Sequence, residues 1–343
     1  GRLARLGFAD AALAVRLLSD PGLVGLGTDA VVDLSLAADP DLALGTLSRI
    51  ADTGDPAARA LVAELDEDEE TRRRVLTVLG ASVALGDHLV RHPRDWTVLR
   101  QHDEDDPAFA PLDVVRAELL RAVGADPSDP LPTAGGSGTD VLAALRVAYR
   151  RRLLAIAASD LADGSPFVEV SAALAELADA VREAALAIAR AEHPDAADLV
   201  RLAVIALGKC GGRELNYISD VDVVYVVEAR EGVDETDAVR AGTRLAQSLM
   251  RACNAPTPEG SIWEVDPNLR PEGKSGALVR TLASYDGYYR RWASTWEFQA
   301  LLKARPAAGD LDLGARLVDL VTPMVWAAAD RANFVEDVQA MRR

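Results

Sequence analysis

Two aspartates, Asp220 and Asp222, stand where a glycine-rich stretch gives way to an apolar run that ends at Val227. Side chains alternate along a strand, so both carboxylates face the same side of it. Carboxylates held this close raise each other's pKa unless a cation lies between them. Their oxygens suit Mg2+, which keeps several waters and shares itself with phosphate oxygens. The pair therefore predicts a magnesium site at the mouth of a sheet.

A third carboxylate, Asp266, ends an alternating segment that starts at Ser261. If this segment is a strand beside the first pair, its carboxylate reaches the same ions. Two ions roughly 3.5 to 4 Å apart can then clamp the attacking and departing oxygens of an in-line displacement. The alternative interpretation is a hairpin loop with solvated aspartates, in which the third caps a turn. We predict that the catalytic residues and the ligands of two Mg2+ ions are Asp220, Asp222 and Asp266.

Groups that could hold a phosphate surround these aspartates in the sequence. Glycines before them would let backbone N–H groups approach a phosphate closely. Seven basic and three acidic residues lie between Arg270 and Arg305, a local net charge of +4. Positive charge of this kind stabilises a phosphoryl transition state, although each cation alone could equally be a solvated surface residue. The residues predicted to bind nucleotide or phosphate are Gly208, Lys209, Gly211, Gly212, Ser219, Arg270, Lys274, Lys303 and Arg305.

The elements that must position these residues form a short α+β segment inside a helical chain. Apolar runs at 199–207 and 221–227 and the alternating segment 261–266 predict strands, and 235–253 predicts a helix. Short helices broken by Asp-Pro, Gly-Asp-Pro and His-Pro turns fill the first hundred residues. Longer helices are expected over about 140–161 and 167–191, and an irregular loop through Gly276 followed by helices closes the chain.

Turn-rich stretches suggest how the chain divides. Residues 103–107 predict a loop, and 126–138 predict a flexible linker because Gly135, Gly136 and Gly138 lie close together. We therefore expect a helical N-terminal region over 1–135 and a catalytic domain over 140–310. Residues 311–343 are expected to begin a further helical domain that the sequence cuts short.

Composition indicates which classes of partner are not expected. The net charge is -17, so the chain as a whole would repel a phosphate backbone and nucleic acid is not expected as a substrate. No apolar run approaches the roughly 18 residues of a membrane span, so no membrane partner is expected. The two cysteines suit a reducing compartment, and we expect a cytoplasmic protein.

The string from Ala206 to Asp222 resembles the bifunctional glutamine synthetase adenylyltransferase/adenylyl-removing enzymes, a branch of the nucleotidyltransferase superfamily that includes polymerase β-like enzymes. Lys209 stands where that superfamily commonly has Ser or Gly, and Asn268 stands where many members have Arg. Further segments carry the same resemblance, and with the first they cover about a third of the chain: Glu264–Asp266, Leu269–Pro271, Gly273–Gly276, Thr295–Glu297 and Ala300–Arg305.

The resemblance implies a largely helical fold around a polymerase β-like core, a small mixed sheet flanked by helices. In that family the N-terminal half removes AMP from a tyrosine of glutamine synthetase by phosphorolysis, and the C-terminal half attaches it from ATP. The long helical front and Asn216, after Glu214 and Leu215, favour the removing half. The implied partners are adenylylated glutamine synthetase, phosphate and ADP or AMP, with Mg2+ as cofactor. A PII-type signal protein is a further candidate partner, and the implied role is regulation of nitrogen metabolism.

Three alternatives remain open from the sequence. The same fold could attach AMP from ATP, or it could transfer a nucleotidyl group to a small molecule. A catalytically inactive helical regulatory module is the alternative from a different class, and retention of all three carboxylates argues against it.

Overall fold

The computed structural model describes residues 2–100, 106–330 and 334–341, so part of the predicted loop at 103–107 and the last two residues lie outside it. The chain forms two compact units. Unit 1 comprises residues 1–110 and 150–173, and unit 2 comprises residues 111–149 and 174–343. The division predicted near residues 135–140 and 310 does not coincide with these units and stays a prediction about independently folding domains.

Unit 1 is built from helices whose starts are set by aspartates. Asp39, Asp55 and Asp68 each accept a hydrogen bond from a backbone N–H in the following first turn, and a proline opens two of these helices. Its elements, including the shares of two helices that continue into unit 2, are α1 (Arg2–Arg5), α2 (Ala11–Leu18), α3 (Thr28–Leu34), α4 (Pro40–Asp52), α5 (Pro56–Glu67), α6 (Glu69–Ala81), α7 (Val83–Arg91), η1 (Pro93–Leu99), η2 (Pro107–Phe109), α9 (Thr139–Leu161) and α10 (Phe167–Glu192).

Unit 2 holds a five-stranded mixed sheet among helices. Its strands are β1 (Val200–Ala206), β2 (Val221–Ala229), β3 (Val265–Asp266), β4 (Val279–Thr281) and β5 (Arg305–Gly309). Its helices, besides the other parts of α9 and α10, are α8 (Leu112–Ala122), α11 (Pro194–Ala197), α12 (Gly208–Gly211), α13 (Glu235–Asn254), η3 (Gly273–Ser275), α14 (Leu282–Arg291), α15 (Thr295–Ala300), η4 (Leu301–Lys303), α16 (Leu311–Ala327), η5 (Ala328–Asp330) and α17 (Phe334–Met341).

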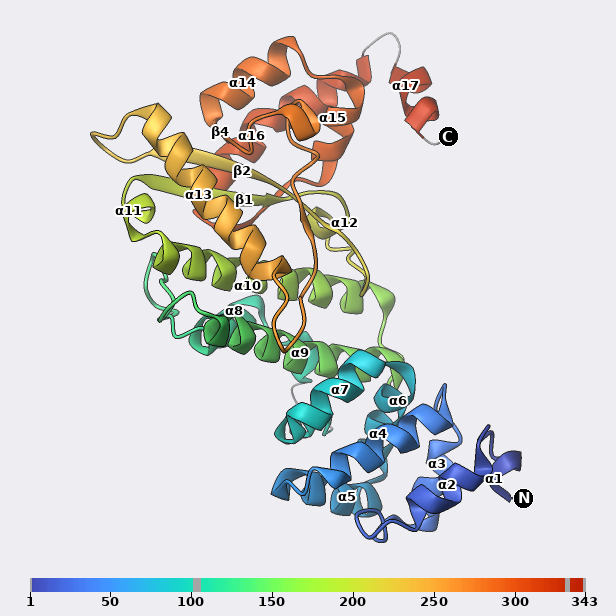
Figure 1. Cartoon of the computed structure of the whole chain (residues 1–343). Coiled ribbons are helices and arrows are strands. Elements are labelled where there is room, and N and C mark those ends of the chain that lie inside the picture. Colours follow the sequence, from blue (N-terminus) through green and yellow to red (C-terminus); the bar gives the residue numbers. More distant parts are fainter. Residues whose placement is uncertain (1, 101–105, 331–333, 342–343) are drawn as a thin grey trace. The chain divides into compact units, whose positions relative to one another are not determined.

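The strand order is β3-β2-β1-β5, with β4 also paired to β2. β1 runs antiparallel to β2 and to β5, whereas β3 and β4 run parallel to β2. Val224 and Val226 pack with side chains of α14 and α16. Val227, on the other face of β2, packs against Gly242 of α13. The sheet therefore lies between α13 on one face and α14 with α16 on the other (Figure 1).

The predicted α+β class is confirmed, but several elements differ from prediction. The predicted strand 261–266 pairs only at Val265–Asp266. β4 and β5 were not predicted, because three and five residues respectively are too short for a clear periodicity, and β5 contains Pro306. The glycine-rich connection after β1 contains one helical turn, α12.

Two residues of the predicted flexible linker at 126–138 are hydrogen-bonded to α10. The backbone N–H of Ala134 donates to the carbonyl of Ala187 at 3.0 Å, and Arg190 donates to the carbonyl of Pro132 at 2.9 Å. These hydrogen bonds tie Pro132 and Ala134 to α10, and the flexibility of the segment as a whole stays a prediction. In the described part of the chain, no helix combines the length and the apolar character that crossing a membrane requires.

Candidate active site

The sheet brings the three predicted carboxylates to one end of two neighbouring strands. β2 and β3 pair in parallel with Asp222 opposite Asp266. Asp220 precedes β2 by one residue, two positions before Asp222, and is exposed at the mouth of the sheet. Because side chains alternate, the face that carries Asp222 continues as Val224 and Val226 in the core. The apolar run thus anchors the strand while its start presents carboxylates.

Electrostatics at this end of the sheet favour a bound cation. The pKa of the Asp222 carboxyl is raised, first by burial and then by the negative charges of Asp266 and Asp220. Lys209 opposes this shift through its positive charge. A divalent cation among the carboxylates would remove the repulsion, and carboxylate oxygens are ligands that Mg2+ takes alongside water and phosphate oxygens.

The oxygens of the three carboxylates do not all lie close enough together to bind one ion at the same time. Among the described residues, no set of ligand oxygens from Asp220, Asp222 and Asp266 has all members within 4.8 Å of one another. A pair of ions roughly 3.5 to 4 Å apart distributes its ligands over a longer span than a single ion does. The arrangement is therefore compatible with ligands shared between two ions, and the donor set fits magnesium.

The glycine turn beside the carboxylates requires glycine for two different reasons. Gly208 has a φ of +52°, and a Cβ there would lie 2.6 Å from an Oδ of Asp222. A Cβ on Gly211 would overlap the carbonyl oxygen of Lys303. The backbone of α12 therefore approaches both the carboxylates and η4 more closely than any side chain would permit. This close approach is the geometry predicted for a backbone that meets a phosphate.

The predicted phosphate-binding cations fall into two groups. Lys209 and Lys274 are exposed and form no ion pair within the described ranges. Lys303 is exposed but pairs with Glu214, and Gly212 lies against its side chain. The hydroxyl of Ser219 donates to the backbone carbonyl of Asp220 at 3.1 Å.

Arg270 and Arg305 are held by protein groups. Arg270 is buried and donates to the carbonyls of Pro267, Lys274 and Gly276, each at 3.0 Å. Its guanidinium therefore closes the loop after β3. Arg305 pairs with Asp179 of α10 and donates to the carbonyls of two α12 residues, Cys210 and Gly211. Direct phosphate contacts by either arginine stay a prediction.

The sequence analysis missed a buried network behind α12. Asp179 of α10 pairs with Arg182 as well as Arg305, and both Asp179 and Arg182 are buried. Two guanidinium nitrogens of Arg182 each lie 3.3 Å from the Sγ of Cys210. Charged residues inside an alanine-rich, otherwise apolar helix were the available signal, since such residues are rarely buried without a partner.

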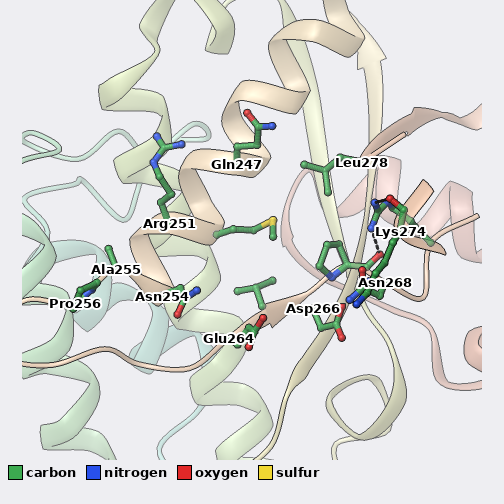
Figure 2. A pocket seen from close by; sticks show the side chains of 14 residues that line it. Gln247, Arg251, Asn254, Ala255, Pro256, Glu264, Asp266, Asn268, Lys274 and Leu278 are labelled. Atoms are coloured by element: carbon green, nitrogen blue, oxygen red, sulfur yellow. Dashed lines mark hydrogen bonds between the residues drawn. The ribbon is translucent and has the colours of Figure 1, made fainter. Parts of the chain in front are cut away.

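A cavity of about 920 Å3 opens beside Asp266. Gln247, Met250, Arg251 and Asn254 form one wall, because positions i, i+3, i+4 and i+7 share a helix face. The opposite side is formed by the loop after β3, which carries Asn268 and Lys274 (Figure 2). The backbone N–H of Asn268 donates to Asp266 at 2.7 Å, so a hydrogen bond links the carboxylate to the start of this loop.

Comparison with known proteins gives a consistent family match. The model of the glutamate-ammonia ligase adenylyltransferase family matches residues 72–319. Three relatives share one description, bifunctional glutamine synthetase adenylyltransferase/adenylyl-removing enzyme. The protein from Streptomyces avermitilis is 51% identical over 100% of this chain and 33% of its own length. That from Cutibacterium acnes is 48% identical over 90% and 31%, and that from Mycobacterium avium is 45% identical over 99% and 32%. The chain thus spans about a third of the length of the curated relatives it matches.

Proposed function

Because this chain belongs to the glutamate-ammonia ligase adenylyltransferase family, we propose that it removes AMP from an adenylylated tyrosine of glutamine synthetase by phosphorolysis. The observation that carries the proposal is the pairing of Asp222 with Asp266 on adjacent parallel strands, with Asp220 and the Gly208 turn beside them. A row of carboxylates next to a close-approaching backbone is suited to phosphoryl-group chemistry.

The reaction has a simple balance. An oxygen of inorganic phosphate bonds to the adenylyl phosphorus, and the bond from that phosphorus to the tyrosine oxygen breaks. The products are ADP and a tyrosine phenolate, which takes up a proton from solvent. A phenol has a pKa near 10, so its anion is a tolerable leaving group when positive charge is close.

The chain's own residues would position and neutralise the reacting groups. Asp220, Asp222 and Asp266 would hold two Mg2+ ions, which supply positive charge to the attacking and departing oxygens when bound. Lys209 adds a fixed charge at the same end of the sheet, and the α12 backbone would orient phosphate oxygens. Catalysis would then rest on positioning and charge stabilisation.

Two features support removal over attachment of AMP, and both rest on the resemblance within the family. In the described residues before β1, the regular elements are all helices, from α1 to α11, in line with the long helical front of the removing half. Asn216 follows Glu214 and Leu215, where the attaching half tends to have Gly. The test incubates the 343-residue chain with adenylylated glutamine synthetase, Mg2+ and phosphate. Phosphate-dependent ADP release is expected. ATP-dependent labelling of unmodified glutamine synthetase, without ADP release from the modified form, would assign the reverse activity.

A further inference from the structure

The three carboxylates lie between two different features at one end of the sheet, the glycine turn and the cavity. α12 follows β1, and Gly208 lies against Asp222. On the far side of β2 lies β3 with Asp266, and beyond it the cavity, whose lining includes Asp266 but neither Asp220 nor Asp222. The order is therefore glycine turn, carboxylate row, cavity. An in-line displacement places its attacking and departing oxygens on opposite sides of the phosphorus, and these two sides offer different places for them.

Resting on the proposed function, we infer that the cavity beside Asp266 is the protein-substrate subsite, which receives the extended segment that bears the adenylylated tyrosine. The glycine turn and Lys209 then serve the phosphate side of the same phosphorus. This assigns the two sides of the carboxylate row to two chemically different reactants.

The charge of the cavity suits a polypeptide better than a polyphosphate. Arg251 is paired with Glu192 at 2.8 Å, and Arg270 is committed to three backbone carbonyls. Within the described residues, the lining charges without an ion pair are Glu264, Asp266, Arg270 and Lys274, two of each sign. Together they give no excess of positive charge for several phosphates.

The remaining polar groups are those that recognise a backbone. The side-chain amides of Gln247 and Asn254 are exposed on one face of α13 and make no hydrogen bond in the part of the chain described. Each amide can both donate and accept. Met250, Leu278 and Pro267 supply apolar surface between them. Amides interspersed with apolar side chains are typical of a groove that takes a peptide.

The sheet also offers an open edge at this place. β3 ends the strand order, so it has β2 on one side only. Ser261–Glu264 carries the alternating pattern of a strand, yet none of these residues joins a strand in the described chain. Two of its backbone groups are already bonded: the N–H of Ile262 donates to the carbonyl of Cys253, and the carbonyl of Glu264 accepts from the N–H of Val221. The side of β3 that faces away from β2 is a sheet edge, and a sheet edge is a template for an added strand. An extended segment laid along β3 would bring its tyrosine to Asp266.

Substitutions at the end of the cavity away from Asp266 can distinguish a bound protein segment from a compact ligand. Ala255 and Pro256 lie at the end of the cavity away from Asp266 (Figure 2). A segment of protein would run past them, whereas a compact group bound at the carboxylates would not. Ala255→Trp fills this far end, and Asn254→Ala removes an amide. Gln299→Ala, an amide in α15 outside the lining, is the matched control.

The experiment compares two substrates for phosphorolysis, adenylylated glutamine synthetase and the adenylyl ester of p-nitrophenol. For both cavity variants we expect the KM of the protein substrate to rise about tenfold, while the KM of the small ester and that of phosphate change less than twofold. An equal rise for both substrates would make the cavity a nucleoside subsite and overturn the inference. Unchanged constants for both would overturn it as well.

A binding measurement separates this inference from the proposed function. Turnover of neither substrate by the unaltered chain would refute the proposed phosphorolysis. In that case the affinity for adenylylated glutamine synthetase, measured by interferometry, still tests the cavity. A tenfold loss in Ala255→Trp but not in Gln299→Ala supports the subsite, and equal affinities of all three proteins contradict it.

Discussion

Acidic residues near α12 fall into two groups, a single buried aspartate and a cluster of three, and they are neutralised in opposite ways. Behind the helix, Asp179 is buried and paired with two arginines, Arg182 and Arg305. In front of it, Asp222 faces Asp266 and Asp220, with Lys209 as its compensating cation. The rear carboxylate carries its counter-charge within the fold. The front carboxylates are left with excess negative charge, which a bound divalent cation would offset.

From this difference we infer a structural role for Asp179, whereas the proposed function gives the front carboxylates a role in catalysis. A buried ion pair holds elements together, since breaking it strands an unpaired charge. A carboxyl such as Asp222, whose pKa is raised by burial and by neighbouring negative charges, is typical of a functional site. Each prediction below alters one member of the comparison, and they run from the largest expected effect to the smallest.

Removing a front carboxylate should abolish activity. Asp220→Asn and Asp222→Asn keep the shape of the side chain but lose its charge, so we expect phosphate-dependent ADP release to fall about a thousandfold. Far-ultraviolet circular dichroism should remain that of the unaltered chain. Asp237→Asn, an exposed carboxyl in the first turn of α13, is the control that should keep full activity. Full activity in the two site variants would reverse the assignment of the front cluster.

Removing the rear carboxylate should lower the stability of the protein rather than act directly on catalysis. Asp179→Ala leaves Arg182 buried without its carboxylate, so the free energy of unfolding should fall by about 3 to 5 kcal/mol. Glu214→Gln breaks the exposed pair with Lys303 and should cost less than about 1 kcal/mol. Urea denaturation measures both. Similar losses in the two variants would erase the distinction between a buried pair and a surface pair.

Replacing Arg270 tests whether this residue stabilises the loop after β3 or binds phosphate. Arg270→Lys keeps the charge but loses the fork that reaches three carbonyls, so we expect a loss of about 1 to 3 kcal/mol and faster proteolysis within 267–276. The KM for phosphate should change less than twofold if the arginine closes the loop. A large rise in that KM with unaltered stability would instead make it a phosphate ligand.

The smallest effect concerns stability and pH. The pKa of Asp222 is raised in the folded chain, so unfolding releases its proton between the unfolded and folded pKa values. Stability therefore falls as pH rises through that window, and the penalty is complete above the folded pKa. Asp222→Asn removes it, and with EDTA present we expect a melting temperature about 1 to 3 °C higher than that of the unaltered chain at pH 7. The gain should shrink toward pH 4; an equal gain at both pH values would contradict this origin.

The front cluster could be predicted from the sequence because its signals are local. Asp-x-Asp at the start of an apolar strand fixes the relative direction of two side chains. A pairing between distant segments was still needed to add Asp266, and its strand proved much shorter than the alternating pattern suggested.

The rear network could not be predicted in the same way. Asp179 and Arg305 are far apart in the chain, and β5, which carries Arg305, lacks a periodic pattern. Arg270 and Arg305 were predicted as phosphate ligands from local charge alone. Local charge does not reveal that backbone carbonyls and a buried aspartate already occupy their guanidinium groups.

The most direct test of the central claim is a calorimetric titration of the chain with Mn2+, a spectroscopically visible substitute for Mg2+, in the presence of ADP. Sharing of divalent cations by Asp220, Asp222 and Asp266 predicts about two bound ions and weaker binding, by at least tenfold, in Asp222→Asn and Asp266→Asn. Binding of the same strength and stoichiometry in all three proteins would contradict it.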